Sequence, residues 1–127
     1  MIAIGIGCKS GVKADDVIAL IEDGLSRVEG ETIAGVFTVA SKSHESGLAE
    51  AAVSLSLPLL FLPEIALKSV ACRTETRSER VVALFGVPSI AETAALVGAG
   101  EGSTLIVPRM TRGNVTCAIA KSAGDRP

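Results

Sequence analysis

The chain has 127 residues, of which 48% are hydrophobic and 20% are charged, and its formal net charge is −2 at pH 7. This length suits one domain with one core, and the composition argues against disorder. The near-neutral charge gives no electrostatic basis for binding nucleic acid. The aromatic residues are three phenylalanines inside apolar runs, so the stacking platforms of single-strand binders are missing.

The order of the residues excludes further classes of protein. No apolar run reaches the ~20 residues that a membrane-spanning helix needs, and the chain opens with an apolar strand pattern instead of a basic leader. We therefore expect a cytoplasmic protein that does not enter a membrane. The three cysteines are widely spaced, which is typical of reduced thiols, and the single histidine leaves too few ligands for a conventional metal site. We expect no metal and no cofactor.

The first third of the chain predicts a strand, a helix and a second strand. Residues 2–8 alternate Ile or Cys with Ala or Gly, so one face fills a core and the other is bare enough for a helix, a strand or a ligand to approach. An apolar stripe at helical spacing runs from Val17 to Val28 and is ended by Gly30. Residues 33–39 are apolar on both faces, as in a strand buried within a sheet.

The middle of the chain continues the alternation of helix and strand. A helix is predicted over residues 47–55, a third strand over 57–62 and a short helical turn over 63–70. Two more helices are predicted over 78–85 and 89–98, each opened by a serine cap.

The last part of the chain predicts a hairpin and a tail. Strands at 103–107 and 115–120 are joined by a short loop at 108–114, and this spacing favours an antiparallel pair. The domain is expected to span residues 1–120, followed by a flexible tail over 121–127.

Together these elements predict a single α/β domain with a mixed sheet of about five strands covered by helices. Strand–helix–strand crossovers are right-handed and parallel, so the first three strands should be parallel and the C-terminal hairpin antiparallel. Ligands on such sheets lie beyond the carboxyl ends of the parallel strands. Here those ends are residues 7–11, residues 40–45 and the region of Pro63.

The turn after the first strand carries groups suited to an anion. Its backbone N–H groups, a hydroxyl and an ammonium would bind a carboxylate or phosphate, and they come from Gly7, Cys8, Lys9, Ser10 and Gly11. The glycine spacing fits neither the dinucleotide fingerprint nor the P-loop, so both nucleotide interpretations are rejected. The alternative is a tight turn whose glycines only permit helix packing. For Cys8, a small apolar residue that closes the strand is favoured over a nucleophile.

A polar cluster follows the second strand and contains Thr38, Ser41, Lys42, His44 and Glu45. Lys42 would hold an anion, and Glu45 or His44 would move a proton, which makes these two the candidate catalytic residues. The equally weighted alternative is a solvated loop in which Glu45 caps the next helix.

Two later groups are also candidates. Ser89 and Glu92 are the two ends of a capping box, which favours a structural role for Glu92 over that of a catalytic acid. Arg109 and Arg112, with Thr111, would either clamp a carboxylate or lie in an exposed hairpin loop.

Four blocks in chain order resemble one family of cobalamin-biosynthesis proteins, formed by stand-alone CobE and the C-terminal domain of CbiG. The blocks are Gly5-Ile6-Gly7-Cys8-Lys9; Thr38-x-x-x-Lys42-x-x-Glu45-x-Gly47-Leu48; Ser78-Glu79-x-Val81 through Gly86-Val87-Pro88-Ser89-x-x-Glu92-x-Ala94-Ala95-Leu96; and Leu105-x-Val107-Pro108 with Val115-Thr116-x-Ala118-x-Ala120. Together they cover nearly the whole chain. Two departures are Ala40, where the family often has an acidic residue, and Arg109, where it usually has a lysine.

The resemblance implies a ligand, a precorrin, with acetate and propionate carboxylates around a flat apolar ring. Lys9, Lys42, Arg109 and backbone N–H groups would meet the carboxylates. The matched blocks add Ser89, Glu92 and Thr116 as substrate-binding positions. The bare face of the first strand would lie against the macrocycle unless a helix covers it.

Three functions are compatible with this resemblance. The first is a binding protein with an auxiliary or carrier role for a precorrin. The second is a precorrin lactone hydrolase that releases acetaldehyde, with water activated by Glu45 or His44 and an oxyanion held by N–H groups after Gly7. The third is an interaction domain for other corrin-pathway enzymes, with a homodimer left open. Because the chain is expected to lack the upstream domains of the fused relative, binding is ranked first.

Overall fold

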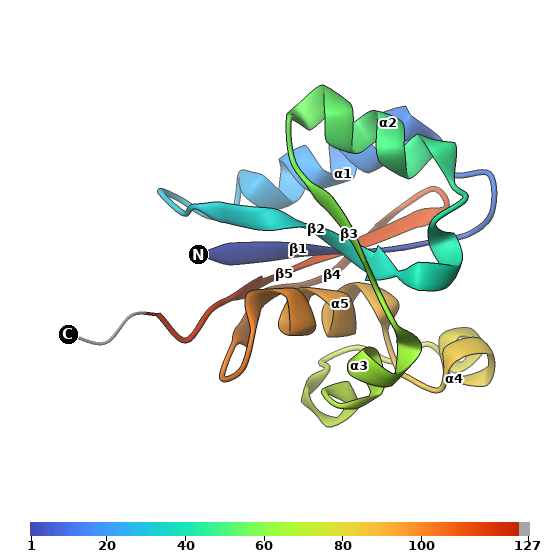
Figure 1. The fold of residues 1–127 in the computed structure, drawn as a ribbon, viewed down its shortest axis with the longest axis vertical. Coiled ribbons are helices and arrows are strands. Elements are labelled where there is room, and N and C mark those ends of the chain that lie inside the picture. The colour runs from blue at the N-terminus through green and yellow to red at the C-terminus, as the bar shows by residue number, and fades with distance from the viewer. Residues whose placement is uncertain (125–127) are drawn as a thin grey trace.

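The computed structural model describes residues 1–124 and contains a five-stranded sheet of order β3-β2-β1-β5-β4 (Figure 1). β1 pairs in parallel with β2, and β2 with β3, whereas β5 pairs antiparallel with both β1 and β4. The predicted mixed sheet, with three parallel strands and a C-terminal hairpin, is therefore confirmed. The strands are β1 (Ile2–Cys8), β2 (Ile33–Val39), β3 (Leu59–Leu62), β4 (Thr104–Arg112) and β5 (Val115–Lys121).

Helices cover both faces of the sheet. α1 and α2 lie on one face, and α5 lies on the other together with α3 and α4 (Figure 1). Each face has its own core: large aliphatic side chains fill the first, and alanines predominate in the second. The helices are α1 (Ala14–Leu25), α2 (Ser46–Leu55), α3 (Glu64–Lys68), α4 (Glu79–Phe85) and α5 (Ile90–Ala99), with 3-10 turns η1 (Ala40–Lys42) and η2 (Ala71–Arg73).

The alternation of β1 explains why the two cores differ. Its isoleucines are fully buried in the core beneath α1 and α2. The opposite face is bare because α5 crosses it closely: a Cβ on Gly5 would overlap the carbonyl oxygen of Ala91 and the backbone nitrogen of Ala95. A helix therefore covers this face at Gly5, which is the condition under which the face was not expected to lie against a macrocycle.

Two other boundaries differ from the sequence-based expectation. α1 ends at Leu25, one turn before Gly30, which has a φ of 65° in the loop that follows. β3 begins at Leu59, after Pro58, whose carbonyl oxygen accepts a hydrogen bond from Val36 N–H at 2.8 Å. The proline thus lies just outside the strand that it was expected to join.

The largest correction concerns β4, which continues to Arg112 through most of the segment predicted as a loop. Pro108 lies within this strand, which is possible because β4 is an edge strand and edge strands tolerate proline. The register with β5 shifts between Val107 and Met110, which is a β-bulge around Pro108 and Arg109. The bulge thus lies at Arg109, which is one of the predicted binding residues.

The predicted tail begins later than position 121. Lys121 is the last residue of β5, and its Nζ lies 2.8 Å from a carboxylate oxygen of Glu31. The next residue, Ser122, donates its backbone N–H to the carbonyl oxygen of Met1 at 2.9 Å. Residues 125–127 of the predicted tail lie outside the described residues.

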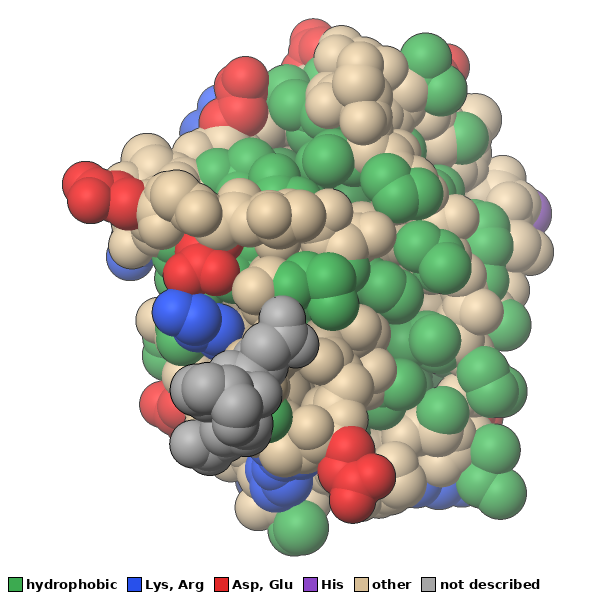
Figure 2. Space-filling view, turned by 60° about the vertical axis from the view of Figure 1, so that its left-hand side comes forward, with side chains coloured by type: hydrophobic (Ala, Val, Ile, Leu, Met, Phe, Trp, Pro, Cys, Tyr) green, Lys and Arg blue, Asp and Glu red, His purple; other side chains and the backbone are tan. Residues whose placement is uncertain are grey.

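The surface keeps several large hydrophobic side chains exposed at the edge strand β3 and on α2 and α3: Val53, Leu60, Phe61 and Ile65. Figure 2 shows a face on which hydrophobic side chains are numerous and charged ones lie mostly toward the margins. Over residues 1–124, no single helix has the length and apolar character to cross a membrane, and α4 and α5 meet that test only as a pair with a 64° bend.

Candidate functional site

A cleft of about 250 Å³ lies at the carboxyl ends of β1 and β2, where the topology predicts a ligand site. Its walls come from the turn after β1, from η1, from α4, from the start of α5 and from the β4–β5 hairpin. Eight of the residues predicted to bind substrate line it: Gly7, Cys8, Lys9, Ser10, Lys42, Ser89, Arg109 and Thr116.

Hydrogen bonds hold the turn after β1 between its neighbours. Gly11 N–H donates to the Glu45 carboxylate at 2.9 Å, which ties this turn to the start of α2. On the other side, Lys9 N–H donates to the carbonyl oxygen of Asn114 at 2.9 Å in the hairpin. Ser10 and Lys42 consequently line one cleft, so the turns that follow β1 and β2 lie side by side.

Glu45 and His44, the two predicted catalytic residues, are not among the residues that line the cleft. The Glu45 side chain is buried, with one oxygen accepting the Gly11 N–H and the other 3.0 Å from Nε2 of the exposed His44. Its side chain forms no capping hydrogen bond with α2, contrary to the alternative in which Glu45 caps the next helix. Glu45 is thus placed to hold the turn after β1, and its carboxylate takes no part in the lining of the cleft.

Four predicted binding residues also lie outside the lining: Gly11, Thr38, Ser41 and Glu92. Thr38 is fully buried, and its hydroxyl donates to the carbonyl oxygen of Ile6 at 2.7 Å. This bond joins β2 to β1 and explains a polar residue inside a buried strand. Ser41 is exposed in η1.

Glu92 is fully buried beneath the cleft and links three segments of the chain. Its carboxylate accepts backbone N–H groups from Glu75 at 2.8 Å, Thr76 at 2.9 Å and Arg109 at 3.0 Å. The capping box is therefore only half formed: Ser89 Oγ accepts the Glu92 N–H at 3.2 Å, but the Glu92 carboxylate does not return to Ser89. It fixes the bulge of β4 instead, and so places Arg109 at the cleft.

Positive charge dominates the lining of the cleft. Its cationic side chains are Lys9, Lys42, Arg80 and Arg109, and within residues 1–124 no aspartate or glutamate joins them. None of the four forms an ion pair with another described residue. Arg112, in contrast, points to Asp16 at 3.5 Å and takes no part in the lining. The cleft therefore offers unpaired charge to an anionic ligand.

Cys8 has the properties of a structural thiol. Burial raises its pKa to about 11, against a smaller opposite effect of Lys42 and a further rise from Glu45. At neutral pH the thiol is protonated and weakly nucleophilic. This agrees with the interpretation of Cys8 as a small apolar residue at the end of β1.

The sequence did not point to α4 as a wall of the cleft. Arg80, Val81, Leu84 and Phe85 line it, together with Ser78, Thr111 and Asn114 from flanking segments. One signal was available: four of the seven residues of α4 are large and apolar, which is more than a single buried face of so short a helix needs. Thr116 and Gly7 lie together at the opposite wall, where the Thr116 hydroxyl donates to the Gly7 carbonyl oxygen at 3.2 Å.

Comparison with known sequences gives a consistent result. The family described as cobalamin synthesis G C-terminus matches residues 2–120. Protein CobE of a Sinorhizobium species is 33% identical over 124 residues, which are 96% of this chain and 80% of that protein. The cobalt-precorrin-5A hydrolase of Priestia megaterium is 27% identical over 122 residues, which are 94% of this chain and 32% of that protein. The chain therefore spans about a third of the hydrolase.

Solved structures are similar to this chain in the same way as the sequences are. The crystal structure of CobE from the cobalamin (vitamin B12) biosynthetic pathway superposes with a TM-score of 0.88 at 28% identity, covering 99% of this chain and 93% of that one. The cobalamin biosynthesis protein chiG of Agrobacterium tumefaciens gives a TM-score of 0.75 at 35% identity, covering 98% and 100%. A cobalamin biosynthesis protein G homologue from Sulfolobus solfataricus, at 22% identity and a TM-score of 0.66 over 94% of this chain and 36% of that one, shares the fold.

Proposed function

Since the chain belongs to the cobalamin synthesis G C-terminal family of cobalamin-biosynthesis proteins, we propose that it binds a carboxylate-rich precorrin in the cleft and acts as an auxiliary or carrier protein. The ligand would be held by its acidic fringe, and the cationic residues would each meet a carboxylate. Chemistry on the ring is left to other enzymes of the pathway.

One observation carries this proposal: the cleft presents Lys9, Lys42, Arg80 and Arg109 without a neutralising carboxylate from the described residues that line it. The four positive charges repel one another in the empty cleft, and a bound polyanion relieves this repulsion. Lys42 and Arg109 are half-buried, so their bonds to a carboxylate would be screened less by solvent than those of exposed groups. A ligand with several carboxylates matches this arrangement better than one with a single negative group.

The test is a titration with purified precorrins and with uroporphyrin, a stable tetrapyrrole that carries the same acetate and propionate groups. Binding should appear as a change in the absorbance of the ring and in the mobility of the pigment. Lys42→Ala and Arg109→Ala should each weaken binding by about tenfold, because a hydrogen bond to a charged group contributes roughly 1.5–3 kcal/mol.

The matched control is Lys13→Ala, which removes an exposed lysine outside the cleft and should leave binding unchanged. No spectral or mobility change with any of these pigments would refute the proposal. Equal affinity of the wild-type chain and a Lys42→Ala, Arg109→Ala double variant would remove this cleft as the site.

Hydrolysis of a precorrin lactone is a second candidate because a cobalt-precorrin-5A hydrolase is among the relatives. The positions of the predicted catalytic groups give it less support: Glu45 is buried against Gly11, and His44 is exposed outside the cleft lining. Release of acetaldehyde from the lactone intermediate decides between the two functions. Full activity of a Glu45→Gln variant would remove that carboxylate from the mechanism.

We also place this role in the cytoplasm, where the free cysteines Cys8, Cys72 and Cys117 would stay reduced. A carrier of a pathway intermediate would have to pass its ligand to the next enzyme. Co-purification with other corrin-pathway enzymes in the presence of the pigment, compared with its absence, tests that contact.

A further inference from the structure

α4 is the least anchored wall of the cleft. None of its seven residues is buried, whereas eight of the ten residues of α5 are. Val81 and Phe85 are half-buried against the core beneath α5, but Leu84 is 60% exposed although it lines the cleft. A large apolar side chain at the mouth of a cleft loses contact with water when an apolar ligand covers it.

Both flanks of α4 are fixed. Before the helix, the Glu92 carboxylate holds the backbone of Glu75 and Thr76. At its base, Ser78 N–H donates to the carbonyl oxygen of Pro88 at 2.9 Å, so the ends of the segment are joined. Gly86, with a left-handed φ of 74°, separates the helix from the buried Val87. The helix therefore lies between two anchored points and has no buried residue of its own.

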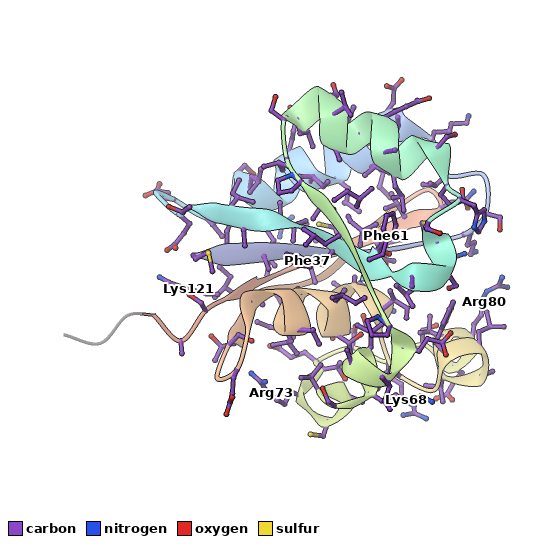
Figure 3. All side chains as sticks on the ribbon, in the orientation of Figure 1. Phe37, Phe61, Lys68, Arg73, Arg80 and Lys121 are labelled. Carbon is purple, nitrogen blue, oxygen red and sulfur yellow. The ribbon has the colours of Figure 1, made fainter. Side chains whose placement is uncertain are left out.

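α4 also differs from the other walls in chemistry. Its contribution to the lining is mainly apolar, from Val81, Leu84 and Phe85, with Arg80 as its one cation. Lys9, Lys42 and Arg109 come from the turns and the hairpin on other walls. In Figure 3, Arg80 extends from α4 at the end of the sheet where these turns lie. A ligand in the cleft thus meets three large apolar side chains on α4 and three cations from the turns and the hairpin.

We propose that α4 is the wall that recognises the ring: it closes on the apolar face of the tetrapyrrole through Leu84 and Phe85, while Arg80 takes a carboxylate at the edge of the ring. This inference rests on the proposed function and adds the basis of its selectivity. Cations alone would bind any polycarboxylate, and the apolar wall makes a flat ring the preferred ligand. Citrate, which has carboxylates and no ring, should therefore compete poorly with uroporphyrin.

The experiment compares Leu84→Ala with Ile65→Ala, using uroporphyrin as the probe. Both residues are exposed apolar side chains on short helices, at 60% and 77% exposure, but Ile65 lies outside the cleft lining. Leu84→Ala should weaken uroporphyrin binding by about tenfold, because the alanine buries less apolar surface against the ring, and should leave weak citrate binding unchanged. Ile65→Ala should bind uroporphyrin as the wild-type chain does.

Hydrogen exchange gives a second readout that does not depend on a variant. Amides of α4 should exchange faster than those of α5 in the free chain and slow by about tenfold or more with bound uroporphyrin. If the wild-type chain binds uroporphyrin, two results would overturn this inference and leave the proposed function standing. One is an unchanged affinity of Leu84→Ala for uroporphyrin, and the other is that α4 amides are as protected as those of α5 in the free chain. Absence of uroporphyrin and precorrin binding by the wild-type chain would overturn both.

Discussion

Replacing Glu92 with glutamine should destabilise the chain, because its carboxylate is the common acceptor for three backbone donors. Glutamine retains one oxygen, which can keep the N–H groups of Glu75 and Thr76, now as bonds to a neutral acceptor. Its amide NH₂ would then face the N–H of Arg109, so a donor meets a donor at the bulge of β4. One unsatisfied N–H costs about 1–3 kcal/mol, and the donors here are partly buried, so we expect a loss of about 2 kcal/mol.

Urea unfolding followed by far-UV circular dichroism measures this loss, since the chain has no tryptophan or tyrosine for fluorescence. Glu92→Ala, which leaves all three donors unpaired, should cost about 4 kcal/mol. Glu101→Gln changes an exposed carboxylate that forms no hydrogen bond or ion pair with another described residue, and should stay within about 0.5 kcal/mol of wild type. A Glu92→Gln variant as stable as Glu101→Gln would refute the assignment of Glu92 as the common acceptor.

Three further predictions concern other positions around β1. Gly5→Ala should lower the free energy of unfolding by at least about 3 kcal/mol, measured by thermal or urea unfolding, because the new Cβ meets the backbone of α5. Gly100→Ala, with open space around it and a φ of 95°, should lower it by about 1–2 kcal/mol. A larger loss for Gly100→Ala than for Gly5→Ala would contradict the close crossing of α5 over β1. Iodoacetamide at pH 7 should label the exposed Cys72 before Cys8, and the labelling rate of Cys8 should rise about tenfold per pH unit toward its pKa of about 11. Peptide mass spectrometry measures both rates, and equal rates at pH 7 would contradict this prediction. Glu45→Ala should weaken uroporphyrin binding by about tenfold. Glu45→Gln should weaken it by less than about threefold, because glutamine still accepts the N–H of Gly11 in the turn after β1. Equal losses of affinity in the two variants would contradict this and indicate that the negative charge itself is needed.

The overall topology could be predicted because its signals are local. Alternation in β1, the apolar run of β2 and the short spacing of the hairpin each indicate one element, and the strand–helix–strand crossovers then make the first three strands parallel. The β4 bulge was missed because its cause is distant in sequence: the Arg109 N–H is held by Glu92 on another element. Pro108 locally signals a stop, and only the edge position of β4 makes the proline acceptable.

The cleft could be predicted only where strand ends define it. Lys9, Ser10 and Lys42 follow parallel strands, and the rule for such sheets places them together. The apolar wall of α4 lies on a connection whose path over the sheet depends on tertiary contacts, so no spacing rule brings Leu84 to Lys42. For Glu45, a carboxylate in a polar loop suggested proton transfer, but no local pattern could show its burial or its bond to the N–H of Gly11, which is distant in sequence.

The pairing of β1 with β5 has a consequence for how the chain is made. β1 leaves the ribosome long before its antiparallel neighbour, which runs from Val115 to Lys121, so the middle of the sheet cannot form until β5 has been made. Contacts of such long sequence separation form slowly, and until they form one edge of β1 stays open. Thr116 and Asn114 arrive with the same late segment, so an unfinished chain has no complete cleft and cannot take up pigment before synthesis passes them.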